Sequence, residues 1–317
     1  MPSAAFSELT LIAIEAAKNA GALLQQGFGS YFEIDSKPGM QNLVTEYDHI
    51  SEKAIITTIS EHFPDHAFLA EESGSTQKES SSVIWIIDPL DGTVNFAHNI
   101  PVFSVSIAAC VDGKIVSGVV YHPMAQELFI AEKGKGAYLN TIPKMIQEPV
   151  LGCVKAPAVE FPQVGPYLKH KTHLRESQPR GFDAAQDRFL NHFRYKPIFV
   201  SKTSDFKNAL MATGFPYDVD KDPLSCVEKF AKMQLKGVPV RRLGSAAIDL
   251  AYVAAGRWDA YWEVGLHPWD MAAGKLLVEE AGGMTSHWDG TPHEIFGYTT
   301  MLASNGQLHP AMIEHLK

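Results

Sequence analysis

The stretch from Trp85 to His98 constrains the fold of this 317-residue chain more than any other. It begins within Val83–Ile87, a short apolar and β-branched run of the kind that forms a strand covered on both faces. Asp88 follows directly, and Pro89 has no N–H to donate and keeps the residue before it extended. The sequence therefore predicts that the strand ends here and presents the Asp88 carboxylate as the chain turns away.

A second carboxylate, a glycine and a hydroxyl complete this turn. Asp91 lies two residues after Pro89, and Gly92 allows a ligand to approach the backbone closely. Free amides at Thr93 and its neighbours could hold phosphate oxygens if a helix begins there. Paired carboxylates suit Mg²⁺, which prefers oxygen ligands. Asp-Pro and Asp-Gly are also common turn formers, so these two pairs alone favour an ordinary turn over a metal site.

Length and composition predict a globular α/β chain without a membrane segment. At 45% hydrophobic residues, 317 residues suffice for one large domain or two closely packed ones. The first 30 residues lack a basic n-region and carry Glu8 and Glu15 within their apolar pattern, so they do not read as a signal peptide. Three cysteines without metal-ligand spacing favour a reducing compartment, with the cytoplasm as the default.

The charge balance indicates which partners the chain would avoid. The net charge of −9 disfavours binding to nucleic acid or to an anionic membrane. An anionic substrate would therefore have to be attracted locally, by bound metal.

Two amphipathic helices are predicted before the central strand. Apolar residues recur at helical spacing after Ser7, a suitable N-cap, and this pattern ends near Gly27. A second helix follows Leu43–Asp48, with Asp48 at its expected start. Because Asp is strongly preferred as an N-cap, the pattern alone favours a capping role for Asp48 over a catalytic one.

Another carboxylate is predicted at the end of a neighbouring strand. Ala67–Ala70 is a brief apolar run that leads directly into Glu71 and Glu72. An isolated Glu-Glu pair is usually a solvated loop. Its place before the Asp88 turn, however, would bring one more acid toward the same site.

The middle of the chain reads as an antiparallel meander. Its strands are expected at Val102–Ala109, Lys114–Tyr121 and Glu127–Ala131, separated by turn-forming pairs. Lys133–Asn140 closes this half with a Gly-Lys-Gly sequence. A Gly-x-Gly pattern alone is a weak phosphate-loop signal and no helix pattern follows, so a turn is the better interpretation.

The segment Thr141–Lys196 departs from this order and is interpreted as an insertion. It has six prolines, little periodicity, and nine Lys/Arg against five Asp/Glu, so it carries +4 while the rest of the chain carries −13. Its histidines lack metal-ligand companions. Because the flanking strands should already be neighbours, we expect the segment to be dispensable for folding and chemistry. The predicted parts are therefore 1–140, the insertion 141–196, and 197–317.

The last part of the chain brings two further candidate regions. Gly244–Ala247 precedes a helix that stops at Gly256, and a glycine there permits close approach of a ligand or simply a tight turn. Trp258–Glu263 reads as an apolar strand that ends in an acid. Asp270 lies at the start of a following helix, where its pattern alone indicates an N-cap.

Several of these sequence motifs resemble the signatures of the inositol monophosphatase family. Members of this family are Mg²⁺-dependent, lithium-sensitive phosphatases. The first is Asp88-Pro-Leu-Asp-Gly-Thr-Val-Asn-Phe-Ala-His98, and the second runs from Trp269 to Gly283. Glu-Glu-Ser after Ala70 and Leu-Val-Thr-x-x-Asp at 43–48 match shorter elements. The resemblance covers about Leu9 to Gln307 without the insertion. It implies a layered αβαβα sandwich of the inositol monophosphatase and fructose-1,6-bisphosphatase type.

The resemblance also implies roles for individual residues. Metal binding falls to the side chains of Glu71, Asp88, Asp91 and Asp270 and to the carbonyl of Leu90. Catalytic roles fall to Glu71 and to the residues that orient the attacking water, Asp48 and Thr93. Substrate binding falls to Lys37, Asp91, Gly92, Thr93, Gly244, Ser245, Ala246 and Glu263. His98 and His267, near the two signatures, are expected to pack or to support these residues.

The function implied is hydrolysis of a phosphate monoester by a water activated with two or three Mg²⁺ ions. The first signature favours inositol monophosphate, whereas adenosine 3′,5′-bisphosphate, fructose 1,6-bisphosphate and NADP are alternatives from related branches. The family also implies a homodimer. A hypothesis of another class is a binding partner of the transcription or ribosome-assembly machinery, as some bacterial relatives are. Such a partnership, or nucleic-acid binding, is not indicated by the composition.

Overall fold

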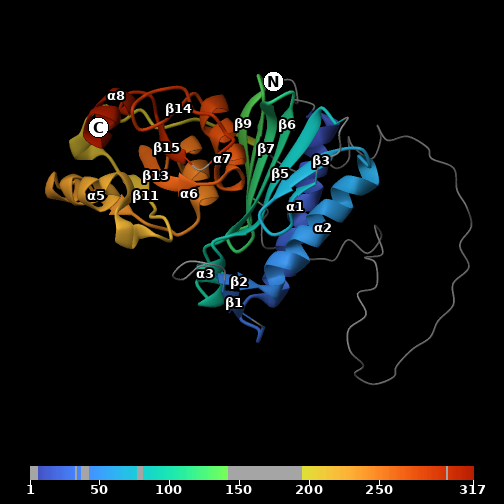
Figure 1. Ribbon diagram of the computed structural model, residues 1–317. Coiled ribbons are helices and arrows are strands. Elements are labelled where there is room, and N and C mark those ends of the chain that lie inside the picture. The colour runs from blue at the N-terminus through green and yellow to red at the C-terminus, as the bar shows by residue number, and fades with distance from the viewer. Residues whose placement is uncertain (1–5, 33, 37–42, 77–80, 142–194, 298) are drawn as a thin grey trace, which may run out of the picture. The chain divides into compact units, whose positions relative to one another are not determined.

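The computed structural model describes residues 6–32, 34–36, 43–76, 81–141, 195–297 and 299–317. These residues belong to one compact unit, which 1–141 and 195–317 form (Figure 1). In it, helices and sheets alternate in layers, so the predicted αβαβα sandwich is confirmed. No helix in the described part of the chain is long and apolar enough to cross a membrane.

The first layer consists of α1 (Glu8–Gly27) and α2 (Glu46–His62), which pack on one face of a large sheet. Ser7 accepts the N-cap hydrogen bond of α1 from the amide of Thr10, and the helix ends at Gly27, as the sequence predicts. Helix α2 begins earlier than predicted. Its N-cap is Thr45, so the interpretation of Asp48 as N-cap is wrong and Asp48 lies in the first turn. A two-stranded sheet of β1 (Ile34–Ser36) and β2 (Leu43–Thr45) precedes α2.

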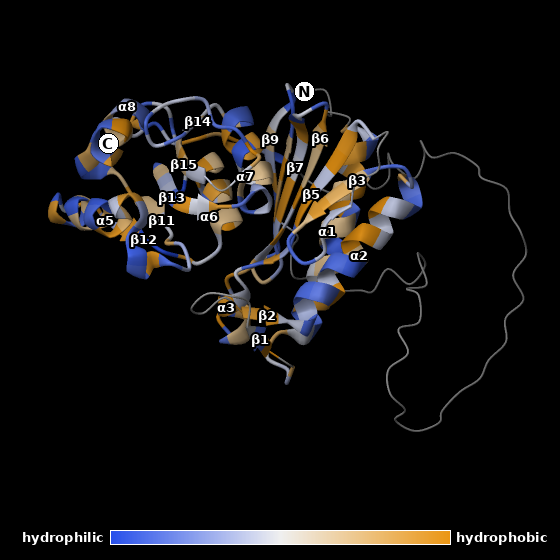
Figure 2. Ribbon diagram, in the orientation of Figure 1, coloured by the Kyte–Doolittle hydropathy of each residue, from blue (hydrophilic) through white to orange (hydrophobic). Residues whose placement is uncertain are grey.

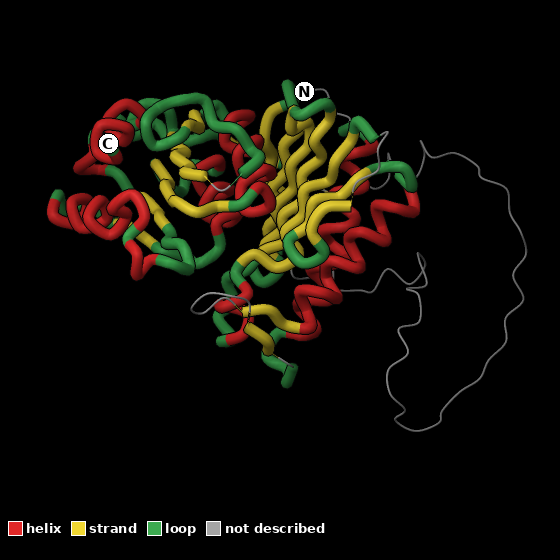
Figure 3. Tube along the Cα trace, viewed as in Figure 1, coloured by secondary structure: helices red, strands yellow, loops and turns green. Residues whose placement is uncertain are grey.

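The second layer is an eight-stranded sheet with the order β10-β9-β8-β7-β6-β5-β3-β4 (Figure 3). The predicted meander is present as three antiparallel strands. The strands are β3 (Ala67–Ala70), β4 (Gly74–Thr76), β5 (Val83–Asp91), β6 (Ser104–Val111), β7 (Lys114–His122), β8 (Glu127–Glu132), β9 (Gly136–Thr141) and β10 (Lys196–Ile198).

Strand β5 is longer than the sequence predicted. It does not end at Ile87 but continues to Asp91, because Ser106 and Ser104 of β6 pair with Asp88 and Asp91. The register shifts between these two pairs, so Pro89 lies at an irregularity where no ladder N–H is required. The β6 partner strand thus holds both carboxylates in an extended, buried segment.

The central layer, α6 (Ala246–Ala254) and α7 (Pro268–Glu280), is buried between the two larger sheets. Alternation along β5 explains how one strand serves two layers. Trp85 and Ile87 pack toward α1 and α2, whereas Ile86 packs toward α6 and α7. The strands of this sheet accordingly carry much of the orange of hydrophobic residues in Figure 2.

A five-stranded sheet and two outer helices complete the sandwich. The sheet order is β12-β11-β13-β15-β14, and Tyr261 faces the central helices while Trp262 faces the outer core. Strand β13 extends past Glu263 to Leu266, so the expectation that Glu263 ends this strand is wrong. The elements are β11 (Met211–Thr213), β12 (Val240–Arg241), β13 (Ala260–Leu266), β14 (Met284–Ser286), β15 (Thr299–Ser304), α5 (Cys226–Leu235) and α8 (His309–Leu316), with short 3₁₀ turns at Phe206–Asn208, Val219–Lys221 and Pro223–Ser225.

The Gly-Lys-Gly sequence forms a turn into β9 and already binds an anionic group of the protein itself. The amides of Gly134 and Gly136 donate to the two carboxylate oxygens of Glu280 in α7, at 2.8 and 2.9 Å. These contacts explain the glycines as a structural link between the sheet and the central helices. They give no support to a phosphate-binding loop.

The two ends of the predicted insertion are adjacent strands. Lys196 pairs with Leu139 and Ile198 with Ala137, in antiparallel register. Of the segment 141–196, only Thr141, Tyr195 and Lys196 lie among the described residues. Tyr195 packs its ring against Phe6 at 5.4 Å, so it belongs to the ordered core rather than to the dispensable segment.

We predict that replacing residues 142–194 by a short Gly-containing turn leaves the chain soluble and changes its melting temperature little. A long loop between fixed neighbours differs from a short one by only about 0.6 kcal/mol per doubling of its length. Thermal unfolding measures the effect. A matched deletion that also removes Tyr195 should melt lower, because Phe6 loses one of its two aromatic partners and keeps only Tyr138. Insolubility of the first variant would show that 142–194 contributes to the structure.

Candidate metal and phosphate site

The four predicted carboxylates come from three elements that meet at one end of the first sheet. Strand β3 pairs in parallel with β5, with Ala70 opposite Ile87, so Glu71 and Asp88 are the next residues on neighbouring strands. The amide of Glu71 donates to the carbonyl of Ile87 at 3.2 Å. Asp91 ends β5, and Asp270 lies in the first turn of α7.

A serine of β6 fixes the start of α7 beside this strand end. Ser106, the partner of Asp88, donates its hydroxyl to the carbonyl of Trp269 at 3.2 Å. Asp270 in turn accepts the amide of His267 at 2.6 Å, so it is not the N-cap that its pattern indicates but a residue that bonds back to the cap. Asp270 also lies close enough to Asp88 for its charge to raise the pKa of that residue.

The acids raise one another's pKa. Burial, followed by the charges of Glu71, Asp91 and Asp270, holds the pKa of Asp88 well above its ordinary value. Burial and then the charge of Glu71 do the same for the pKa of Asp270. Like charges held this close require a compensating cation or protonation. The site therefore has the electrostatics of a cation site.

The donor chemistry fits Mg²⁺. Every candidate ligand is a carboxylate or carbonyl oxygen, the ligand type that hard divalent cations prefer. Among the described residues, no three or more His, Cys, Asp or Glu side chains are arranged closely enough in this conformation to hold a metal ion. The carboxylates would thus converge on an ion as it binds and leave positions for water and phosphate, as is usual for Mg²⁺.

The protein itself donates hydrogen bonds to both carboxylate oxygens of Asp91. Ser245 and the amide of Ala247 donate to one oxygen at 2.6 and 2.8 Å, and the amide of Ala246 donates to the other at 3.2 Å. Burial raises the pKa of Asp91, and these donors counteract that rise. The structure thus brings Gly244–Ala246 to the acid cluster, with the start of α6 directed at Asp91.

The turn after Asp91 is held by close backbone contacts. Gly92 has φ +98°, and a Cβ there would lie 3.1 Å from the carbonyl oxygens of Gly244 and Val102. Helix α3 (Thr93–Ala97) begins directly after Gly92, which is the condition under which the amides at Thr93 and its neighbours could hold phosphate oxygens. The side chain of Asn95 has a role that the sequence pattern did not indicate: its amide donates to the carbonyls of Val102 and Leu243 at 2.7 and 2.8 Å and ties α3 to the loop before α6.

Asp48 and Thr93, the residues expected to orient water, contact each other. The hydroxyl of Thr93 lies 2.9 Å from one oxygen of Asp48 and 3.0 Å from the carbonyl of Leu90. The other Asp48 oxygen accepts the amide and the hydroxyl of Thr45, each at 2.7 Å. Burial raises the pKa of this fully buried carboxyl, against the effect of its hydrogen bonds. Asp48 is therefore both a member of the α2 cap and a partner of Thr93.

Glu263 lies beside the cluster, at the second sheet. It accepts a short hydrogen bond from the hydroxyl of Tyr261, and burial raises its pKa to about 7. A Cβ on Gly214 would overlap the Glu263 carboxylate, so glycine at 214 makes room for this acid. Tyr261 and Gly214 are contacts that the sequence pattern did not identify.

The remaining candidates are Lys37 and the two histidines near the signatures. Lys37 lies outside the described residues. His98 is exposed at the end of α3 rather than packed, and His267 stacks on Trp269 with ring centroids 4.8 Å apart.

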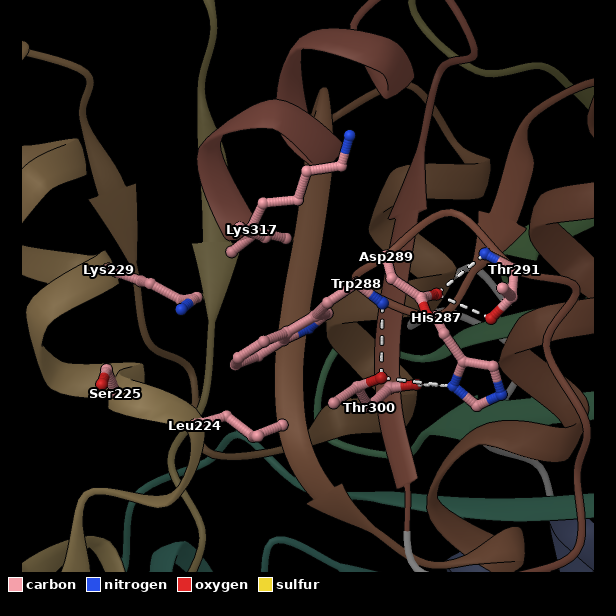
Figure 4. A pocket seen from close by; sticks show the side chains of 10 residues that line it. Leu224, Ser225, Lys229, His287, Trp288, Asp289, Thr291, Thr300 and Lys317 are labelled. Carbon is pink, nitrogen blue, oxygen red and sulfur yellow. Dashed lines mark hydrogen bonds between the residues drawn. The ribbon is translucent and has the colours of Figure 1, made fainter.

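A separate hollow of about 730 Å³ lies on the outer side of the second sheet (Figure 4). Trp288, Lys229 and Lys317 are among the residues that line it, and the Thr300 hydroxyl hydrogen-bonds with His287 and accepts the amide of Trp288. It has a single carboxylate, Asp289, and none of the predicted site residues. The acid cluster is therefore the candidate active site.

Known proteins resemble this chain over nearly its whole length. Residues 6–147 and 145–317 match the family described as the inositol monophosphatase family. The chain is 34% identical over 307 residues to the Nus factor SuhB of Escherichia coli (strain K12), covering 96% of this chain and 94% of that protein. It is 37% identical over 305 residues to the inositol-1-monophosphatase of Synechocystis sp., covering 96% and 87%. The crystal structure of the extragenic suppressor protein suhB from Bartonella henselae matches with a TM-score of 0.76 and 32% identity, covering 98% and 99%.

We predict that Asp270→Asn stabilises the metal-free protein and that this gain increases with pH. The pKa of Asp270 is raised in the folded state, so its ionised form destabilises the fold as pH rises above the ordinary carboxyl range of about 4. In a chelator the variant should melt above wild type at pH 8, and the difference should shrink toward pH 5. Added Mg²⁺ should raise the melting temperature of wild type more than that of the variant.

Asp112→Asn is the matched control for this experiment. Asp112 directly follows Val111 of β6, which pairs with Val83, so it lies at the opposite end of β5 from Asp91. Asp112 has a positive φ, a conformation that asparagine also tolerates. This control should show neither the pH-dependent gain nor the loss of the Mg²⁺ response. If Asp270→Asn melts below wild type at pH 8 without metal, the acids do not repel one another as described.

Proposed function

The chain belongs to the inositol monophosphatase family, whose members are generally Mg²⁺-dependent phosphatases, and on this basis we propose that it hydrolyses a phosphate monoester. We propose inositol monophosphate as the substrate, with inositol and phosphate as products. The observation that carries this proposal is the meeting of Glu71, Asp88, Asp91 and Asp270 at one end of the first sheet.

Metal binding would use the side chains of these four acids and the carbonyl of Leu90. We propose two or three Mg²⁺ ions, because one ion cannot neutralise both four carboxylates and a phosphate. When bound, Mg²⁺ supplies charge neutralisation of the ester and a water of lowered pKa. The chain has to hold these ligands, place the water and bind the alcohol.

Asp48 and Thr93 would place the attacking water. The Thr93 hydroxyl donates to Asp48, so its lone pairs can accept a hydrogen bond from a water on the side of the acid cluster. The raised pKa of Asp48 suits a group that takes part in proton transfer, since its carboxylate gains by sharing a proton. Glu71, which directly follows β3, would assist as a metal ligand near the same water.

The ester would bind across the junction between β5 and α6. We propose that the amides of Gly92 and Thr93 hold phosphate oxygens, as in the family signature. Gly244, Ser245 and Ala246 would meet the alcohol, with Glu263 as an acceptor for one of its hydroxyls. Asp91 lies between these groups and would contact both metal and substrate. Lys37, in a part of the chain that is not described, remains a predicted substrate contact.

Other esters and other roles are alternatives within this proposal. Adenosine 3′,5′-bisphosphate, fructose 1,6-bisphosphate and NADP are the competing substrates. The Escherichia coli relative is named a Nus factor, which favours a second candidate, binding to transcription or ribosome-assembly machinery. Retention of polymerase or ribosomal proteins on the immobilised chain in salt would support it. We further propose a homodimer located in the cytoplasm.

A panel of these esters, assayed with Mg²⁺, tests the proposed reaction. Wild type and Asp112→Asn should release phosphate from inositol 1-phosphate fastest. Asp270→Asn should lose at least about 100-fold of that rate, because removing a metal ligand costs several kcal/mol of transition-state stabilisation. Turnover near wild type in the folded Asp270→Asn variant would refute the assigned role.

Lithium inhibition is expected if one metal position beside Asp91 and Asp270 is weakly held. Li⁺ is close to Mg²⁺ in size and carries half its charge, so it could occupy this position and slow product release. Rates with LiCl in the millimolar range should fall below rates with NaCl at equal ionic strength. Equal rates in the two salts would contradict a site of this kind.

A further inference from the structure

The loop after β11 forms a wall beside Glu263. Strand β11 pairs in parallel with β13 and β12, so the carboxyl ends of the three strands meet at one edge of the second sheet. Thr213 donates its hydroxyl to the carbonyl of Trp262 at 2.6 Å, which locks the end of β11 to β13. The next residue, Gly214, lies against the Glu263 carboxylate so closely that a Cβ would overlap it.

Packing behind this wall is tight up to Tyr217. Phe215 contacts Phe230 edge-on at 5.5 Å, and the Arg242 guanidinium lies 5.3 Å from the Phe215 ring. Pro216 is buried, and its carbonyl accepts the amide of Val219 at 3.1 Å. Tyr217 is nevertheless 51% exposed. A large ring that follows a buried proline on a packed loop, yet stays in solvent, is placed for contact with a ligand.

The exposed ring is close to the acid cluster. Burial of the hydroxyl, followed by the charges of Glu71, Asp270, Asp88 and Asp91, raises the pKa of Tyr217. The phenol is therefore neutral at physiological pH and does not serve as a base. Tyr217 thus lies on the loop that begins against Glu263, within range of the charges of the four acids where the phosphate is proposed to bind.

We propose that Tyr217 determines specificity for the alcohol, by packing its ring on the apolar face of a ring-shaped leaving group. Cyclitol and sugar phosphates have such a face, and open-chain polyol phosphates do not. The aromatic surface supplies contact area at small cost in side-chain entropy. This inference rests on the proposed function, because it assigns part of the substrate to the same site.

The test measures equilibrium binding of two esters, inositol 1-phosphate and glycerol 2-phosphate, to the full chain by calorimetry. Ca²⁺ replaces Mg²⁺ as the oxygen-binding cation so that binding is measured apart from turnover. Tyr217→Ala removes the ring, and Tyr217→Phe removes only the hydroxyl. Phe199→Ala is the matched control, because it also truncates an exposed aromatic side chain. The Phe199 backbone lies beside Gly256, which follows the C-terminal end of α6, whereas Asp91 contacts the N-terminal end of that helix.

We expect Tyr217→Ala to weaken binding of inositol 1-phosphate about ten-fold, which corresponds to ~1.4 kcal/mol. Binding of glycerol 2-phosphate should stay within about two-fold of wild type, as should both esters with Tyr217→Phe and Phe199→Ala. In turnover with Mg²⁺, Tyr217→Ala should raise KM for inositol 1-phosphate and leave kcat near wild type.

Three results would overturn the inference: equal weakening of both esters, no weakening of either, or Tyr217→Phe behaving like Tyr217→Ala. Equal weakening would mean that Tyr217 acts through the metal and phosphate. Wild type could also bind both esters, with the variants changing that binding as expected, and yet hydrolyse neither ester. This result would refute the proposed function and leave the role of Tyr217 in binding intact. A chain that binds neither ester would refute both.

Discussion

The hydrogen bonds of the Asp91 carboxylate join the two halves of the site. Asp91 ends the long strand of the first sheet, and it accepts the hydroxyl of Ser245 and the first amides of α6. A negative charge at the start of a helix is stabilised by the unpaired amides and the helix dipole. Residues more than 150 positions apart in the chain therefore meet at a fixed place. The groups proposed to contact phosphate at Gly92 and Thr93, and the alcohol at Gly244–Ala246, lie around this junction.

The same arrangement sets stability against function. The pKa values of Asp88, Asp91 and Asp270 are all raised. The ionised forms of these carboxyls are therefore less stable in the folded chain than in water. Buried like charges destabilise a fold unless a cation offsets them. The apolar layers packed on both faces of β5 stabilise the fold and offset the cost of burying these acids. Such local conflicts are typical of functional sites.

Local patterns predicted the elements well, but they did not predict contacts made across the fold. Ser7 and Gly27 mark the ends of α1 because capping is a local property. Pro89 did not end β5, because pairing with Ser104 resumes after the irregularity. Asp48 and Asp270 were expected as N-caps from their patterns, and both lie within the first turn instead, where an acid can bond the cap and still face the site. The resemblance of the two signatures pointed to the acids. The contacts of Asn95 with Leu243 and of Gly214 with Glu263 join residues far apart in the chain, so they have no local signal.

The edges of the eight-stranded sheet limit how copies of the chain can associate. One edge is β10, a three-residue strand of Lys196, Pro197 and Ile198, and the other is β4, which is equally short. Proline, lysine and short length at an edge oppose the addition of a further strand from another molecule. Self-assembly by continuing this sheet from one molecule into the next is thus disfavoured. Any symmetric pair of chains would have to be built from side-chain packing between helices, loops or sheet faces, and its strength would follow the shape and polarity of those surfaces.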